Sequence, residues 1–71
     1  MYENFYHKLG QNIKKYREQK ALTQQQLADK INKSLNFVGK VEVAYSKPSL
    51  NTLIDISNAL GTDVSELTKV D

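Results

Sequence analysis

The chain has 71 residues, a formal net charge of +2 and no cysteine. This length accommodates one small domain, and the absence of cysteine excludes a disulfide framework and a thiolate metal site. The single histidine, His7, is expected on the surface rather than in a metal site, and no segment resembles a membrane span or signal peptide, so we expect a cytoplasmic protein without a membrane partner.

The first predicted helix covers about residues 3–20. Its apolar side chains Phe5, Leu9, Ile13 and Tyr16 recur at helical spacing and form one stripe. Charged and amide side chains occupy the rest of the helical wheel. The stripe is therefore expected to face the core.

A capping box marks the start of the second helix. Thr23 is followed three positions later by Gln26, and in this motif each side chain satisfies a backbone N–H of the other residue. The predicted helix runs from about 24 to 31. Asn32 comes next, and asparagine tolerates the left-handed conformation in which many helices end.

Ser34 is the expected N-cap of a third helix, which should run from Leu35 to about Val43. Two short helices joined by a tight turn form a helix-turn-helix, here at about 24–43. In DNA-binding proteins of this kind, one helix lies across the phosphate backbone and the next enters the major groove. A helical hairpin inside any small bundle has the same pattern, so the pattern alone leaves DNA binding undecided.

Two further helices are expected after Pro48, whose ring disfavours helix at the preceding residue. Ser49 is the N-cap of the fourth helix and Gly61 is its stop signal. The side chains expected in its buried stripe are Leu50, Leu53, Ile54, Ser57 and Leu60. Asp63 and Glu66 form a second predicted capping box, which opens a fifth helix at about 64–70. The sequence thus predicts one all-helical domain, residues 1–71, with five short helices.

Charge is distributed unevenly along the chain. Residues 8–47 contain nine basic and three acidic side chains, a net charge of +6, whereas residues 48–71 have a net charge of −3. A polyanion would be bound by the first of these segments. The same lysines could instead be solvated helix faces, and charge alone does not separate the two interpretations.

The stretches LTQQQLADKINKS and KPSLNTLIDISNALG, together with Val38, Val41 and Glu42, resemble the Cro and lambda-repressor type of helix-turn-helix proteins, the Xre family. The resemblance covers about residues 9–67. It implies a lambda-repressor-like domain of five helices that binds double-stranded DNA in the nucleoid. It further implies a dimer on a two-fold operator.

The resemblance also implies roles for single residues. Gln24 occupies the position where the family has a glutamine that bonds a phosphate. Arg17 and Glu42 occupy positions that form an ion pair between the first helix and the recognition helix in many members. Either charge could instead be a solvated surface group. Ala44 departs from the family, which commonly has glycine where the recognition helix ends, and alanine is strained in the left-handed conformation.

The third helix can be read by angle at 100° per residue. Val38 and Val41 then face the core together with Ser34. Asn36 and Lys40 lie on the opposite side beside Gly39, and Leu35 and Phe37 lie on the flanks. The expected base-reading residues are Leu35, Asn36, Phe37, Gly39 and Lys40. Asparagine suits adenine, lysine suits guanine or a phosphate, and an apolar side chain can cover a thymine methyl group. Phe37 could equally pack at the edge of the core, and Gly39 could allow close approach to DNA.

Phosphate contacts are expected from the start of the second helix, the turn and the loop after the third helix. The expected residues are Thr23, Gln24, Lys33, Ser34, Tyr45 and Lys47. Lys14 and Lys15 are weaker candidates, because they point in different directions and at least one should face away from DNA.

Self-association is expected through apolar residues near the chain ends, because one short recognition helix reads few base pairs. The expected dimer interface contains Val64, Leu67 and Val70, with Tyr2 or Tyr6 as a possible addition. The same residues could instead attach the last helix to its own domain.

The function that these features favour is a sequence-specific transcriptional regulator, most simply a repressor. One histidine, no cysteine and no glycine-rich phosphate loop leave no catalytic site, so neither an enzyme nor a cofactor or small-molecule ligand is expected. The alternative is an antitoxin-like protein-interaction module. In that case Leu35, Phe37 and Val43 would contact a protein partner.

Overall fold

The structure is a computed structural model that describes residues 2–70, with side chains from Asn4 to Val70. Its helices are α1 (Tyr2–Gln19), α2 (Gln24–Lys30), α3 (Leu35–Glu42), α4 (Leu50–Leu60) and α5 (Val64–Leu67). The predicted all-helical class and the order of five helices are confirmed, and residues 2–70 contain no strand. None of these helices is both long and apolar enough to cross a membrane.

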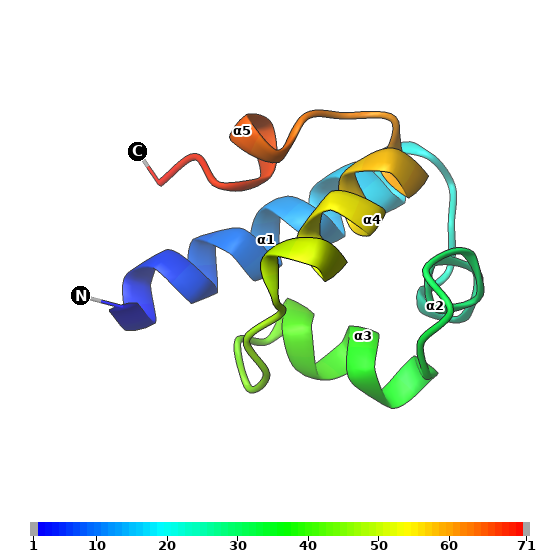
Figure 1. Cartoon of the computed structure of the whole chain (residues 1–71), viewed down its shortest axis with the longest axis horizontal. Helices are drawn as coiled ribbons and strands as arrows, with labels where there is room; N and C mark the ends of the chain where they lie inside the picture. Colours follow the sequence, from blue (N-terminus) through cyan, green and yellow to red (C-terminus); the bar gives the residue numbers. More distant parts are fainter. Residues whose placement is uncertain (1, 71) are drawn as a thin grey trace.

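The helices wrap around α1, the longest of them (Figure 1). α4 crosses in front of α1, whereas α3 runs along the lower edge of the view and α5 lies at the upper edge. α2 lies at one end of the molecule, and both chain termini lie at the other end. The helix-turn-helix is therefore on the opposite side of the molecule from α5.

All five helices contribute to one core. Its buried apolar side chains are Leu9, Ile13, Leu27, Ala28, Ile31, Val38, Val41, Leu53, Ile56, Leu60 and Leu67. Leu9 and Ile13 of the stripe predicted for α1, and Val38 and Val41 of α3, are among them. Phe5 and Tyr16 of that stripe are half-buried and pack against this core, whereas Ser34 is exposed. Burial of these side chains fixes the position of α3 relative to α1 and α2.

The stripe predicted for α4 is partly wrong. Leu50 and Ile54 are 66% and 42% exposed, whereas Thr52 and Ile56 are buried. Thr52 was not part of the predicted stripe, and its hydroxyl oxygen accepts a hydrogen bond from the Ser49 hydroxyl at 3.1 Å. A locally satisfied hydroxyl can be buried at little cost. α4 is thus rotated from the predicted orientation and presents two apolar side chains to solvent.

Most helix ends agree with their predicted signals. The capping box of Thr23 and Gln26 is formed, and the Ser34 hydroxyl accepts a hydrogen bond from the Phe37 N–H at 3.0 Å. Asn32 and Ala44 adopt the left-handed conformation with φ of 60° and 66°, as the turn and the end of α3 require. Alanine is strained there because its Cβ crowds the following carbonyl.

α5 begins at Val64 as predicted, but it is shorter than predicted and lacks the predicted capping hydrogen bonds. It ends at Leu67, and Asp63 makes no side-chain capping hydrogen bond. The expected capping box fails because Glu66 accepts a hydrogen bond from the Tyr16 hydroxyl at 2.9 Å instead. Asn12 donates to the carbonyl oxygens of Leu67 and Lys69, both at 2.9 Å. Contacts with α1 therefore hold the C-terminal segment in place.

Candidate nucleic-acid interface

A buried polar network joins α1, α2 and α3. Arg17 Nε donates to Glu42 Oε2 at 2.7 Å and Arg17 Nη2 donates to Glu42 Oε1 at 3.1 Å, with both residues only 8% exposed. Arg17 Nη1 also donates to the Leu22 carbonyl oxygen at 2.8 Å. The hydrogen bond to Glu42 raises the pKa of Arg17, although burial acts in the opposite direction. The network ties the end of α3 to the two preceding helices.

Gln24 belongs to the same network. Its Nε2 donates to Glu42 Oε1 at 3.0 Å, so the hydrogen bond joins the first residue of α2 to the last residue of α3. An amide nitrogen carries two protons, so one remains for a contact outside the protein. Gln24 therefore lies where a phosphate contact is geometrically possible, but its orientation is set by Glu42.

The exposed surface of α3 is largely apolar. Leu35 and Val43, at the two ends of the helix, are 47% and 68% exposed. Asn36 is also exposed, and Lys40 is half-buried. Phe37 is half-buried and packs against the core, and part of its ring stays accessible. The side chains that can reach a groove are thus mainly those on the Leu35–Gly39–Val43 side and on the adjacent Asn36–Lys40 side.

Three lysines near α3 lie over aromatic rings. The Lys33 ammonium is 5.6 Å from the centre of the Phe37 ring, Lys40 is 5.6 Å from Tyr45, and Lys47 is 5.3 Å from Tyr6. Such contacts are weak at exposed sites, but they favour particular positions of the ammonium groups. The turn, α3 and the following loop each present one lysine.

The two lysines of α1 that were weaker candidates are both exposed. Lys15 lies over the Tyr16 ring at 5.2 Å, and its charge helps to lower the pKa of Glu66 in α5. Lys15 is therefore on the side of α1 that faces α5, away from α3. This position makes Lys15 the member of the pair that is turned away from the candidate interface.

Two glycines differ in what surrounds them. A Cβ added at Gly10 would lie 2.7 Å from the Val41 carbonyl oxygen and still closer to that of Glu42, so α1 packs directly on the backbone at the end of α3. A Cβ added at Gly39 would meet only Gln24 Oε1, at 3.8 Å. Sequence reasoning missed Gly10, although a glycine in the middle of a strong helical pattern was the available signal.

The predicted dimer interface requires a correction. Leu67 is completely buried in the core of its own domain, so it cannot contact a second chain. Val64 is half-buried and Val70 is exposed. Tyr6 is half-buried beside Phe5 and Lys47, and the side chain of Tyr2 lies outside the described residues. Of the expected set, Val64, Val70 and Tyr6 retain accessible surface.

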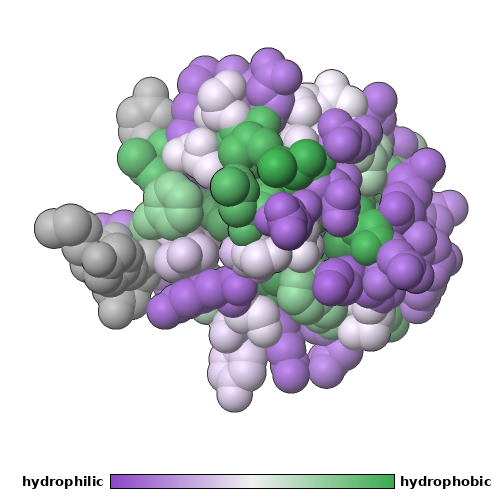
Figure 2. Space-filling model, in the orientation of Figure 1, coloured by the Kyte–Doolittle hydropathy of each residue, from purple (hydrophilic) through white to green (hydrophobic). Residues whose placement is uncertain are grey.

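Outside α3, hydrophobic surface is exposed over α4 and α5 on the face shown in Figure 2. Leu50 and Ile54, one helical turn apart on α4, are the accessible apolar side chains of that helix. We call Leu50, Ile54, Val64 and Val70 the α4–α5 patch. This patch was not predicted, because Leu50 and Ile54 were expected to face the core.

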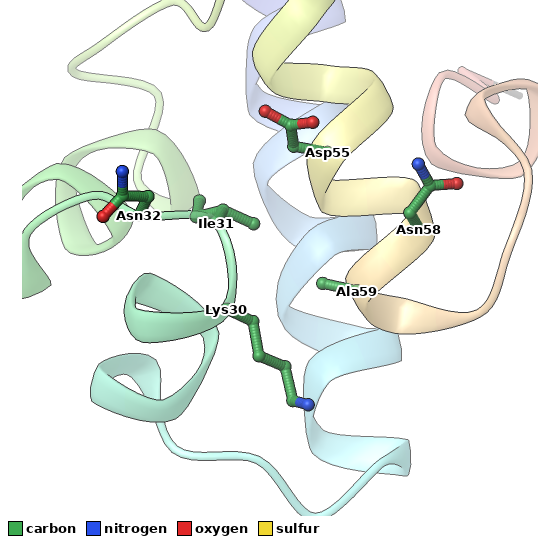
Figure 3. Close-up of a pocket in the computed structure, with 6 residues that line it drawn as sticks. All are labelled: Lys30, Ile31, Asn32, Asp55, Asn58 and Ala59. Atoms are coloured by element: carbon green, nitrogen blue, oxygen red, sulfur yellow. The ribbon is translucent and has the colours of Figure 1, made fainter.

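A pocket opens between the end of α2 and α4 (Figure 3). Asp55 and Asn58 of α4 and Lys30 and Asn32 of the α2 end contribute its polar side chains, and the Lys30 ammonium points away from Asp55. A carboxylate at the rim makes this pocket unsuitable for a phosphate. In residues 2–70, no group of three or more His, Asp or Glu side chains comes together as a metal site.

A family model described as helix-turn-helix matches residues 13–67. The immunity repressor protein of Bacillus phage phi105 is 42% identical over 59 residues, which cover 83% of this chain and 41% of the relative. The control protein C.SmaI of Serratia marcescens is 36% identical over 59 residues, 83% of this chain and 70% of the relative. The HTH-type transcriptional regulator YqaE of Bacillus subtilis is 41% identical over 60 residues, 84% of this chain and 52% of the relative. The chain thus spans about half or less of the length of the phi105 repressor and of YqaE.

Solved structures with the same fold include the restriction-modification controller protein C.AhdI of Aeromonas hydrophila. It has a TM-score of 0.84 and 31% identity, and the match covers 87% of this chain and 94% of that one. The clp gene regulator ClgR of Corynebacterium glutamicum has a TM-score of 0.86 at 24% identity, over 89% of this chain and 67% of that one. The second likeness concerns the fold alone.

Proposed function

Because the chain belongs to the helix-turn-helix family of DNA-binding transcriptional regulators, which are not enzymes, we propose that it binds a two-fold operator as a homodimer and represses transcription by occupying it. The observation that carries the proposal is the support of α3. Arg17 of α1 and Gln24 of α2 bind Glu42 on the side of α3 that faces the domain. The side of α3 that faces away from the domain is open to solvent. A rigidly held helix of this size fits the major groove.

Phosphate binding would come from the rim of α3. Lys33, Lys40 and Lys47 supply positive charge there, and the nearby acid Glu42 is neutralised by Arg17. Thr23, Gln24, Ser34 and Tyr45 supply the neutral donors. We assign base contacts to Leu35, Asn36 and the surface at Gly39, and leave Phe37 to the core. Lys40 is counted with the phosphate-binding lysines because its ammonium lies over the Tyr45 ring.

A second copy of the chain is proposed because α3 is too short to contact many base pairs. α3 has eight residues and is therefore about 12 Å long, which covers three or four base pairs. Two copies would double the contacts and place half-sites about 34 Å apart. The α4–α5 patch is the proposed contact between the copies, because its side chains are apolar, keep accessible surface and lie outside α3.

A salt titration tests DNA binding. With three lysines per domain and six per dimer, the logarithm of affinity for a duplex should fall with the logarithm of salt concentration with a slope of about −5. Lys33→Ala removes two phosphate contacts from a dimer and should make this slope less negative by about two units. Lys15→Ala is the matched control, since Lys15 faces α5, and should leave the slope unchanged.

A protein partner for α3 is the competing function, because Leu35, Val43 and Tyr45 are exposed apolar side chains at this surface. The same titration separates the two functions. Absence of binding to any duplex at low salt contradicts the proposed operator binding and favours the protein partner.

A further inference from the structure

The surface of α3 offers few hydrogen-bonding groups to a groove. Gly39 has no side chain, and Leu35 and Val43 lie one turn on either side of it. The Lys40 ammonium is directed toward the Tyr45 ring, beyond the C-terminal end of α3. Asn36 is left as the exposed polar side chain of α3. Hydrogen bonds from α3 alone therefore supply little discrimination between bases.

Leu35 is distinguished from the other apolar side chains of α3. It is the first residue of the helix, and it is 47% exposed, whereas Phe37 is packed against the core. The first residues of a recognition helix are the ones that reach base edges. Val43 follows the last helical residue, at the opposite end. Leu35 is therefore the apolar group placed to enter the groove.

We propose that Leu35 reads the 5-methyl group of a thymine, so that each half-site is selected by an apolar contact at a fixed position. This inference rests on the proposed operator binding. The thymine methyl group is the apolar feature that base edges present in the major groove, and its burial against a leucine removes apolar surface of both partners from water. The bare Gly39 would let the helix approach closely enough for this contact.

The experiment begins with selection of a preferred site from random duplexes by the full chain. Each thymine of the selected site is then replaced in turn by deoxyuridine, which lacks the methyl group but keeps every hydrogen-bonding atom. At one thymine per half-site, we expect the affinity of the unmodified protein to fall about four-fold, which corresponds to burial of one methyl-sized group. 5-Methylcytosine at the same position should bind more tightly than cytosine.

Three variants assign the effect to Leu35. Leu35→Ala should bind the thymine and deoxyuridine sites equally, whereas Leu35→Met should keep the difference because it keeps the apolar contact. Gln11→Ala, on the exposed surface of α1, should also keep the four-fold difference. Leu35→Ala removes no core contact and introduces a better helix former, so this variant is expected to fold.

The possible failures are distinguishable. If selection yields no preferred sequence, both the operator binding and the inference are overturned. If a preferred site is found but deoxyuridine changes nothing, or changes the affinity of Leu35→Ala as much as that of the parent chain, only the thymine contact is overturned.

Discussion

At the scale of single residues, the two helical glycines have different reasons for being glycine. Gly10 allows the backbones of α1 and the α3 end to touch, whereas Gly39 has room for a Cβ within the domain. The first is explained by packing alone. The second has no structural reason in the described part of the chain, which leaves the surface of α3 and its partner as the explanation.

Gly10→Ala should lower the free energy of unfolding by about 1–3 kcal/mol, because the added methyl group would overlap backbone atoms that cannot move aside easily. Gly39→Ala should instead raise it by about 1 kcal/mol through helix propensity. Urea unfolding measures both changes. In the same Gly39→Ala variant, DNA binding should weaken; tighter binding would contradict close approach at Gly39.

The buried pair of Arg17 and Glu42 should be more costly to break than to replace. Glu42→Ala leaves an unpaired guanidinium in the core, and we expect a loss of about 3–5 kcal/mol in the free energy of unfolding. The double variant Arg17→Met, Glu42→Leu should recover much of this loss because it removes both charges. A double variant that is no more stable than Glu42→Ala would show that the charge is not the cause.

At the scale of elements, α5 has only four residues, and its position depends on its contacts with α1. Its attachment includes the hydrogen bond from the Tyr16 hydroxyl to Glu66 and an ion pair between Lys69 Nζ and Glu66 at 3.4 Å. The hydrogen bond from Tyr16 and the charge of Lys69 lower the pKa of Glu66. The same hydrogen bond to Glu66 raises the pKa of Tyr16.

These shifts predict how the attachment depends on pH. Because the folded-state pKa of Glu66 is lowered, its contribution is present above the ordinary carboxyl pKa of 4.5 and is lost as pH falls through the lowered value. Because the pKa of Tyr16 is raised, its contribution is present below 10.0 and is lost as pH rises through the raised value. Tyr16→Phe should therefore reduce stability mainly between these limits, as measured by thermal unfolding at several pH values.

Tyr45→Phe is the matched control, because the Tyr45 side chain is exposed on the other side of the domain. It should leave the pH profile of unfolding unchanged. Equal effects of the two substitutions would contradict a specific role for the contact between Tyr16 and Glu66.

At the scale of the whole molecule, the orientation of α4 decides which surface is free for a second copy. Leu50→Asp places a charge in the α4–α5 patch, and it should weaken self-association at least ten-fold in sedimentation equilibrium because burial of the carboxylate is costly. Leu35→Asp is the control, since it changes a comparably exposed leucine on α3. Equal self-association of both variants would place the interface elsewhere.

The sequence by itself determined the five helices and most of their ends, with α5 as the exception. The capping box at Thr23, the Ser34 cap and the left-handed Asn32 are interactions among residues at most four positions apart, so local pattern was sufficient to predict them. The resemblance to Xre-type proteins predicted the contact of Arg17 with Glu42. Together these signals located the helix-turn-helix and its exposed surface.

Only the tertiary structure decided which of the apolar side chains near the edge of the core turn inward and which turn to solvent. Leu67 and Phe37 turn inward, Leu50 and Ile54 turn outward, and Glu66 contacts Tyr16 rather than a helix cap. The physical reason is that burial depends on neighbours far apart in the chain, and a helical wheel with apolar residues on two adjacent sides is compatible with more than one rotation. Packing against α1 selected one of these rotations, and with it the surface that α4 leaves open.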